Sequence, residues 1–315
     1  RLGATIDFYN TNTKDLLLAR KLPTSAGADG NFTIMQNIGR TNNKGVEVTL
    51  SGYPIRKKNF SWRATFTFSR NVEKIKELVD GNDIVLDGTD KETKTLMIGH
   101  PITSYNTYQY QGIWRTDEAA EAAKYFTTSA KTTSFKPGDY KILDRNGDFI
   151  IDMDHDYDYI GSSTPDWFAG FDHTFQYKNF DLNIYFYFRW GQYGSNPGAN
   201  LDPATGGGYT LYDKWFWAAG TNENAKLPPL DAGKKHFDYQ GYQSVWYCDR
   251  SYFKIKNVSL GYTLPKSVLS RAGIKNLRLY VSAANPLYFS KSSWLEGIDP
   301  EGSLRNYIFG VEFTF

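Results

Sequence analysis

Alternation of apolar and polar residues at every second position recurs along this chain of 315 residues, with the apolar residues of each run on one side. Period two is the repeat of a β-strand that has one apolar face. Regular runs lie near residues 2–9, 46–50, 61–68, 182–189, 277–283 and 307–315, and less regular ones lie at 166–177 and 251–264. The sequence therefore predicts about eight strands.

The connections between these strands alternate strictly between short and long. The short ones are 53–59, 178–179 and 265–275, and the long ones are roughly 10–42, 71–165, 191–250 and 289–304. Outer-membrane barrels show this asymmetry, with brief periplasmic turns and extended outer loops. A soluble β-sandwich has no reason to keep every long loop at one end. The pattern therefore favours an all-β fold, a transmembrane antiparallel barrel whose strands need about 9–11 residues to span.

Some local features refine this prediction. Lys254 and Lys256 would fall on the apolar face of their strand unless a β-bulge intervenes. Within the long connection 71–165, the stretch Tyr105–Trp114 reads as a strand of the outer loops, and the Ala-rich Glu118–Tyr125 reads as a short helix. Any further spans in that connection must come in pairs.

Composition narrows the class of protein. Aromatic residues make up 17% of the chain, which suits aromatic girdles or a sugar-binding surface. The net charge of +2 is too balanced to indicate a nucleic-acid partner. Cys248 is the single cysteine, so no internal disulfide forms. Because the chain opens directly on a strand pattern, we expect it to be a fragment of a longer protein.

The last strand resembles the C-terminal signal by which outer-membrane proteins are recognised for barrel assembly. An exposed edge strand offers unpaired backbone groups to which another strand can add. The simpler alternative is a β protein that happens to end in phenylalanine. The assembly signal would consist of Tyr307, Phe309, Val311, Phe313 and Phe315.

Several segments together resemble the SusC-like TonB-dependent transporters of the outer membrane, the RagA/SusC family. They follow one another in the family's order from end to end of the chain. These segments are Asn43–Val48, Gly99–Ile102, Tyr108–Ile113, Pro137–Lys141, Asp144–Asp148, Tyr177–Leu182, Asn257–Tyr262 and Val281–Pro286.

The resemblance implies a larger protein in which residues 1–315 form the C-terminal portion of a 22-stranded barrel with long extracellular loops. The plug domain and the N-terminal strands would lie outside this chain. It further implies import of oligosaccharides, glycans or peptides across the outer membrane of a Gram-negative, Bacteroidetes-type cell. The expected partners are the remainder of the barrel and plug, a SusD-like surface lipoprotein, TonB and the lipid bilayer.

One loop has the spacing of a calcium site. Oxygen-bearing side chains stand at the first, third, fifth and ninth positions of an EF-type loop, namely Asp144, Asn146, Asp148 and Asp152. The pattern departs from that loop at Phe149, where a sharp turn favours glycine, and at His155, where a bidentate glutamate closes the site. The alternative is an Asx-rich turn held by side chain–backbone hydrogen bonds. Calcium is the one ion or cofactor that the sequence suggests.

The long connection 191–250 contains an aromatic group that could stack on sugar rings. Packing against neighbouring loops or a partner protein is the alternative. The residues predicted to contact substrate are Tyr209, Tyr212, Trp215 and Trp217.

No pattern in the sequence supports an enzyme. Asp152 with Asp154 or Asp156 could suggest a glycosidase, but sequence spacing does not place two carboxylates across a cleft. The four histidines are scattered and form no zinc pattern. The rival functions are a self-contained small barrel, acting as a porin or adhesin, and a soluble carbohydrate-binding β protein.

Overall fold

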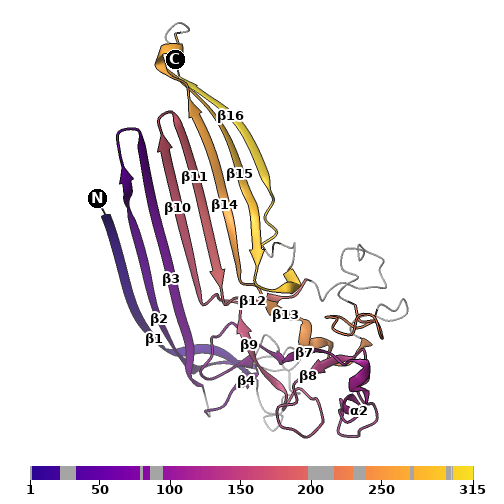
Figure 1. Cartoon of the computed structure of the whole chain (residues 1–315). Coiled ribbons are helices and arrows are strands. Elements are labelled where there is room, and N and C mark those ends of the chain that lie inside the picture. The colour runs from indigo at the N-terminus through magenta and orange to yellow at the C-terminus, as the bar shows by residue number, and fades with distance from the viewer. Residues whose placement is uncertain are drawn as a thin grey trace.

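The computed structural model consists of one large antiparallel sheet and a body of folded loops at one of its ends (Figure 1). It describes residues 2–21, 33–78, 81–85, 95–197, 216–229, 238–269, 273–295, 299 and 301–314. The sheet has eight strands in the order β1-β2-β3-β10-β11-β14-β15-β16. These are β1 Leu2–Lys21, β2 Thr33–Arg56, β3 Phe60–Leu78, β10 Trp167–Tyr177, β11 Phe180–Trp190, β14 Tyr252–Thr263, β15 Asn276–Ser290 and β16 Asn306–Thr314. The prediction of an all-β antiparallel fold with eight wall strands is confirmed.

The remaining elements are short and belong to the connections. They are β4 Ile84–Val85, β5 Thr95–Leu96, β6 Ser104–Tyr108, β7 Tyr110–Ile113, η3 Thr116–Glu118, α2 Ala119–Ala122, β8 Tyr140–Ile142, β9 Tyr157–Ser162, β12 Tyr193–Ser195, η8 Tyr242–Val245, β13 Tyr247–Asp249, α3 Lys266–Leu269 and η10 Ser293–Leu295. The predicted loop strand appears as β6 and β7, and the predicted helix is reduced to η3 and α2. None of the described helices has both the length and the apolar character needed to cross a membrane.

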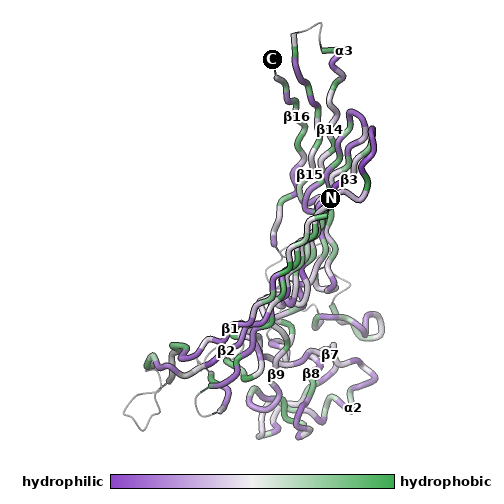
Figure 2. Tube along the Cα trace, turned by 90° about the vertical axis from the view of Figure 1, so that its left-hand side faces the viewer, coloured by the Kyte–Doolittle hydropathy of each residue, from purple (hydrophilic) through white to green (hydrophobic). Residues whose placement is uncertain are grey.

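The short turns all lie at one end of the sheet and the long connections gather at the other (Figure 1). The predicted asymmetry of the loops is therefore confirmed. The expected boundaries of the first connection were wrong, because β1 continues to Lys21 and β2 already begins at Thr33. Its periodicity disappears because polar side chains pair there: Asn42 donates to Asn10 at 2.6 Å and to Asn12 at 2.9 Å. Figure 2 shows these two strands leaning away from the loop body.

One face of the sheet is apolar and the other is polar. On the apolar face, aromatic side chains stand in cross-strand rows, such as Phe66, Phe171 and Phe186 on β3, β10 and β11. On the polar face, Asn183 donates to Asp172 at 3.3 Å and Asn257 donates to Asn183 at 3.4 Å. This division follows from the two-residue repeat of a strand and fits a wall between lipid and a polar lumen.

The ion pairs between β11, β15 and β16 lie on the polar face, as the alternation predicts. Arg278 donates to Asp181 at 2.6 Å, and Glu312 of the last strand lies 3.6 Å from the same guanidinium. Close approach on this face also explains Gly310, where an added Cβ would collide with the Tyr280 ring. On the polar side, one ion network therefore joins β11, β15 and β16, and the Tyr280 ring packs over Gly310 between the last two strands.

A β-bulge at Lys256 resolves the conflict seen in the sequence. The partners of Tyr185 and Phe186 on β14 are Asn257 and Ile255, so Lys256 is skipped. The extra residue changes which alternate side chains of the strand point to the apolar face, so that Phe253 and Ile255 lie on that face. Lys254 instead turns to the polar side, where it is fully buried. The Lys256 ammonium lies 4.6 Å from the centre of the Tyr187 ring.

The bulge makes a sharp prediction for the wall. Deleting Lys256 should force residues 252–255 to exchange faces, which removes Phe253 and Ile255 from the apolar side at a cost of about 1.5–3 kcal/mol each. We expect a severe loss of folded, heat-modifiable protein in outer-membrane fractions. The matched control Lys256→Gln keeps the extra residue and should fold like the wild type. Equal yields from the deletion and the control would contradict the role of the bulge.

Candidate functional site

The long connections fold into a body with its own aromatic core. One cluster contains Trp114, Phe135 and Ile151, and a second contains Ile113, Tyr140 and Val245, which come from connections far apart in sequence. A Lys141 ammonium lies 4.5 Å from the centre of the Trp114 ring and pairs with Glu118 at 2.6 Å. The described outer loops are therefore packed against one another.

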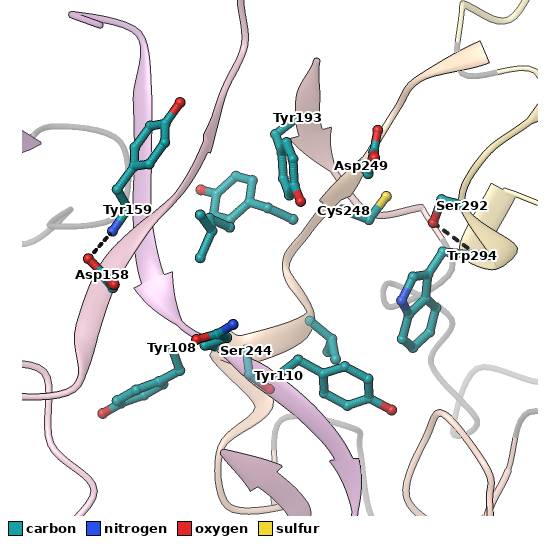
Figure 3. A pocket seen from close by; sticks show the side chains of 14 residues that line it. Tyr108, Tyr110, Asp158, Tyr159, Tyr193, Ser244, Cys248, Asp249, Ser292 and Trp294 are labelled. Carbon is teal, nitrogen blue, oxygen red and sulfur yellow. Dashed lines mark hydrogen bonds between the residues drawn. The ribbon is translucent and has the colours of Figure 1, made fainter. Parts of the chain in front are cut away.

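A cleft of about 400 Å³ opens in this body, close to the ends of the wall strands (Figure 3). It lies among short elements that lead into or out of the sheet: β9 precedes β10, β12 follows β11, and β13 precedes β14. Its aromatic lining consists of Tyr108, Tyr110, Tyr159, Tyr193, Tyr247 and Trp294. The wall strands thereby determine where these side chains stand.

Each of these rings is held by a neighbour. Tyr247 stacks on Tyr105 with ring centres 4.3 Å apart, and Tyr159 lies 4.2 Å from His100. The Tyr193 ring covers Gly161, where a Cβ would collide with it. The Tyr110 hydroxyl donates to the Lys226 carbonyl at 3.0 Å. The cleft is thus a preformed surface of fixed aromatic faces.

The charged groups at the cleft are paired. Asp249 forms an ion pair of 2.7 Å with Lys291, and Asp158 lies 3.2 Å from Arg145. Burial raises the pKa of Tyr159 and of Tyr193, so both hydroxyls are neutral donors near pH 7. Burial also raises the pKa of Cys248 to about 12, which leaves an unreactive thiol. The arrangement is suited to binding a neutral ligand by stacking and hydrogen bonds.

The predicted calcium loop folds as a series of side chain–backbone turns. Asp144 accepts the N–H groups of Gly147 at 2.7 Å and Phe149 at 2.9 Å. Asn146 accepts from Asp148 at 3.2 Å, and Asp148 accepts from Ile150 at 2.7 Å. These hydrogen bonds describe the Asx-rich alternative, and no group of three or more His, Cys, Asp or Glu side chains within the described ranges is gathered as a metal site.

Two further features of this loop bear on the cation. Phe149 has a φ of +64°, so the sixth position adopts the left-handed turn of an EF-type loop although it is not glycine. Asp152 accepts from His155 Nδ1 at 3.0 Å, and this contact raises the pKa of the imidazole. Asp156 is buried and accepts the N–H groups of Arg145 and Asp152. The backbone turn and the oxygen-bearing side chains of this loop suit a hard cation, and calcium binding stays a prediction.

Of the four aromatic residues predicted to contact substrate, only Trp217 lies within the described residues; Tyr209, Tyr212 and Trp215 lie outside them. Trp217 is half-buried, packs against the core cluster of Tyr140 and Val245, and donates to Glu223 at 3.1 Å. Glu223 also accepts from the backbone N–H of Gly220 at 2.6 Å and of Thr116 at 2.9 Å. Trp217 is therefore part of a clamp between loops, which is the packing alternative.

The terminal strand is present as predicted. β16 pairs with β15, and Tyr307, Phe309, Val311 and Phe313 are exposed on its apolar face, whereas Phe315 lies outside the described residues. The role of this strand in assembly stays a prediction.

Known proteins resemble this chain in sequence and in fold. The family described as "TonB dependent receptor-like, beta-barrel" matches residues 1–149. TonB-dependent receptor P3 of Formosa agariphila is 33% identical over 311 residues, which cover 97% of this chain and 29% of that protein. TonB-dependent receptor SusC of Bacteroides thetaiotaomicron is 27% identical, over 96% of this chain and 28% of that protein.

The predicted resemblance to SusC-like TonB-dependent receptors is confirmed.

A solved structure supports the fold of this family. The RagAB peptide transporter superposes with a TM-score of 0.70 at 24% identity, covering all of this chain and 34% of the solved chain. The present chain thus spans about three-tenths of the length of the curated relatives.

The tyrosine-lined cleft was not predicted from the sequence. Tyr159, Tyr193 and Tyr247 come from three separate segments, and no spacing in the chain brings them together. The available signal was the surplus of tyrosine around Tyr105–Tyr110, which lies on β6 and β7 beside the cleft.

The loop 144–156 allows a direct test of calcium binding. Titration of Ca²⁺ into the EDTA-treated full-length receptor should give a dissociation constant of about 0.1–1 mM, the range of extracellular calcium modules. Asp144→Ala should abolish the heat of binding because it removes the first ligand. Asp117→Ala, an exposed carboxylate of the same loop body, is the control. Absence of binding to the wild type would leave the loop as an Asx-rich turn.

The Glu223 clamp predicts a pH dependence. The N–H of Gly220 is the foremost of the donors that lower the pKa of Glu223 to about 2, from an ordinary value of 4.5. Because the folded-state pKa is depressed, the carboxylate stabilises the loop fully above pH 4.5, and that contribution is lost as the pH falls toward 2. Glu223→Gln should therefore speed amide exchange in residues 216–229 at pH 7, with the difference from wild type shrinking near pH 2.

The control for this measurement is Glu121→Gln, which removes an exposed carboxylate that pairs with Lys124 across one helical turn. This variant should leave exchange in residues 216–229 unchanged. Equal exchange in Glu223→Gln and the wild type at pH 7 would show that the clamp is not what orders this loop.

Proposed function

We propose that this chain forms the C-terminal part of the wall of an outer-membrane importer that takes up nutrients. One observation carries the proposal: a sheet with one apolar and one polar face ends, on the side of the long connections, at a tyrosine-lined cleft. The apolar face suits lipid, the polar face suits a lumen, and the cleft stands where a ligand would enter from outside.

The edges of the sheet support a larger barrel. Among the described residues, β1 pairs only with β2, and β16 pairs only with β15. Unpaired strand edges are not tolerated in lipid, so further strands must cover them. This favours a larger barrel with a plug, which we place in the remainder of the protein, over the rival of a self-contained eight-stranded porin or adhesin. The exposed apolar face disfavours a soluble carbohydrate-binding protein.

The chemistry of the cleft supports a neutral or weakly charged substrate. Fixed tyrosine faces stack on sugar rings and on the side chains and backbone of peptides alike, and neutral hydroxyls donate to carbonyl or hydroxyl oxygens. Oligosaccharides and peptides are therefore the proposed substrates. Of the similar proteins, RagAB is described as a peptide importer, which gives peptides a direct precedent. Both carboxylates of the cleft are engaged in ion pairs, which favours a role in binding and transport over catalysis.

The proposed partners follow from the family. The name of the family and of its relatives supports coupling to TonB, and the similarity to SusC supports a SusD-like surface lipoprotein over the outer loops. The relatives come from Formosa and Bacteroides, which supports location in the outer membrane of a bacterium of that kind.

Uptake by the full-length receptor tests this function. Cells that express it should accumulate labelled peptides or oligosaccharides only when TonB is present. Combined Tyr193→Ala and Tyr247→Ala should reduce uptake at low substrate concentration about tenfold, because each stacked ring contributes roughly 0.5–1.5 kcal/mol. Tyr177→Ala, at the opposite end of the wall, is the control. Uptake that does not depend on TonB would instead support a passive pore.

A further inference from the structure

The apolar face of the wall carries a groove that the import function does not use. It has a volume of about 560 Å³ and is lined by residues of β1, β2, β3 and β10. These parts of the strands lie toward the end of the sheet with the short turns, and Figure 1 shows where that end is. Its walls include Leu50, Trp62, Phe66 and Phe171. A smooth barrel surface needs no such depression, so its cause lies in the residues of the sheet.

The groove arises where small residues meet in one cross-strand row. Gly52 pairs with Ala64, and Ala64 pairs with His173. The rows on either side contain the large pairs Leu50–Phe66 and Ile55–Trp62. A register shift after Gly52 also places Tyr53 and Pro54 opposite a single residue of β3. The result is a trench one row wide between two rows of bulky side chains.

A polar pair stands inside this apolar trench. Trp62 Nε1 donates to His173 Nδ1 at 3.2 Å. Since an indole N–H can only donate, the neutral imidazole carries its proton on Nε2. That proton can be offered to an ester or phosphate oxygen. His173 lies four residues from the end of β10, roughly 13 Å along the strand at about 3.3 Å per residue.

The end of the sheet next to the groove forms a basic rim. Arg56 is the last residue of β2, Lys57 and Lys58 lie in the β2–β3 turn, and Lys178 lies in the β10–β11 turn. The two turns are joined, because the Lys178 N–H donates to the Asn59 carbonyl at 2.9 Å. The Arg56 guanidinium lies 5.2 Å from the centre of the Tyr53 ring, which itself lines the groove. All four cations are exposed, and residues 51–66 and 173–180 contain no Asp or Glu.

From these observations we infer that the groove binds one anionic phospholipid of the periplasmic leaflet, with an acyl chain in the trench and the phosphate at the basic rim. The inference rests on the proposed membrane position of the wall, in which the short turns face the periplasm. An apolar chain fits the aromatic and aliphatic lining, and clustered lysine and arginine side chains beside a membrane attract anionic lipid. The imidazole Nε2 supplies a donor between the two regions.

Native mass spectrometry of the full-length receptor, purified from outer membranes in detergent, tests the inference. The probes are dioleoyl phosphatidylglycerol, dioleoyl phosphatidylethanolamine and lipopolysaccharide. We expect one phosphatidylglycerol to be retained, with a preference of about tenfold or more over phosphatidylethanolamine, since each basic residue near the surface strengthens binding severalfold.

Two variants attack the two parts of the site. Ala64→Leu fills the trench, and the double variant Lys57→Gln and Lys58→Gln removes half of the basic rim. Each should weaken phosphatidylglycerol binding about tenfold. The matched controls are Ala283→Leu on the apolar face of β15, and Lys266→Gln with Lys275→Gln near the β14–β15 turn. Both controls should bind like the wild type.

Equal binding of the two phospholipids, unchanged binding by the variants, or preferential retention of lipopolysaccharide would each overturn the inference. Failure of the proposed function looks different. A receptor that imports substrate in a TonB-dependent manner but shows no preference for phosphatidylglycerol refutes the lipid site alone. A protein that retains phosphatidylglycerol as expected but imports nothing refutes the transport role and leaves the site standing.

Discussion

Backbone hydrogen bonding is the constraint on which the rest of this structure depends. In the hydrocarbon of a membrane, each N–H and C=O must find a partner within the protein. β10 meets this requirement without interruption, because Trp167–Tyr177 pair residue by residue with both β3 and β11. Since side chains alternate along a strand, this fixed register also decides their faces. It sets Phe171 among other aromatic rings and Asp172 among polar groups.

The register is interrupted at two places, and each interruption produces a special feature of the wall. The bulge at Lys256 turns Lys254 to the polar side, where its ammonium pairs with Glu301 of the last connection. The shift after Gly52 leaves the trench beside His173. Each register shift removes a hydrogen bond between neighbouring strands or leaves a side chain less well packed. In return, the first attaches an outer loop to the wall, and the second shapes a surface toward lipid.

How far the sequence predicts this molecule differs between the wall and the loops. The eight strands, the one-sided apolar pattern and the need for a bulge near Lys254 were readable, because a half-buried strand leaves a two-residue period. The extensions of β1 and β2 were not, because Asn10 and Asn42 pair through side-chain hydrogen bonds that have no hydropathic period. The cleft was also out of reach, since Tyr159, Tyr193 and Tyr247 meet only through tertiary contacts.

The cleft and the wall are joined by short paired segments and by ion pairs. Tyr193 follows β11 by three residues, Tyr247 precedes β14 by five, and the segments that bear them pair as β12 and β13. Nearby, Glu301 joins Arg189 of β11 to Lys254 of β14, and Lys291 lies over Trp190 while it pairs with Asp249. Both tyrosines are therefore joined to neighbouring wall strands through short, hydrogen-bonded segments. Because close-packed elements deform little, the register of β11 and β14 fixes the aromatic faces of the cleft relative to the polar face of the wall.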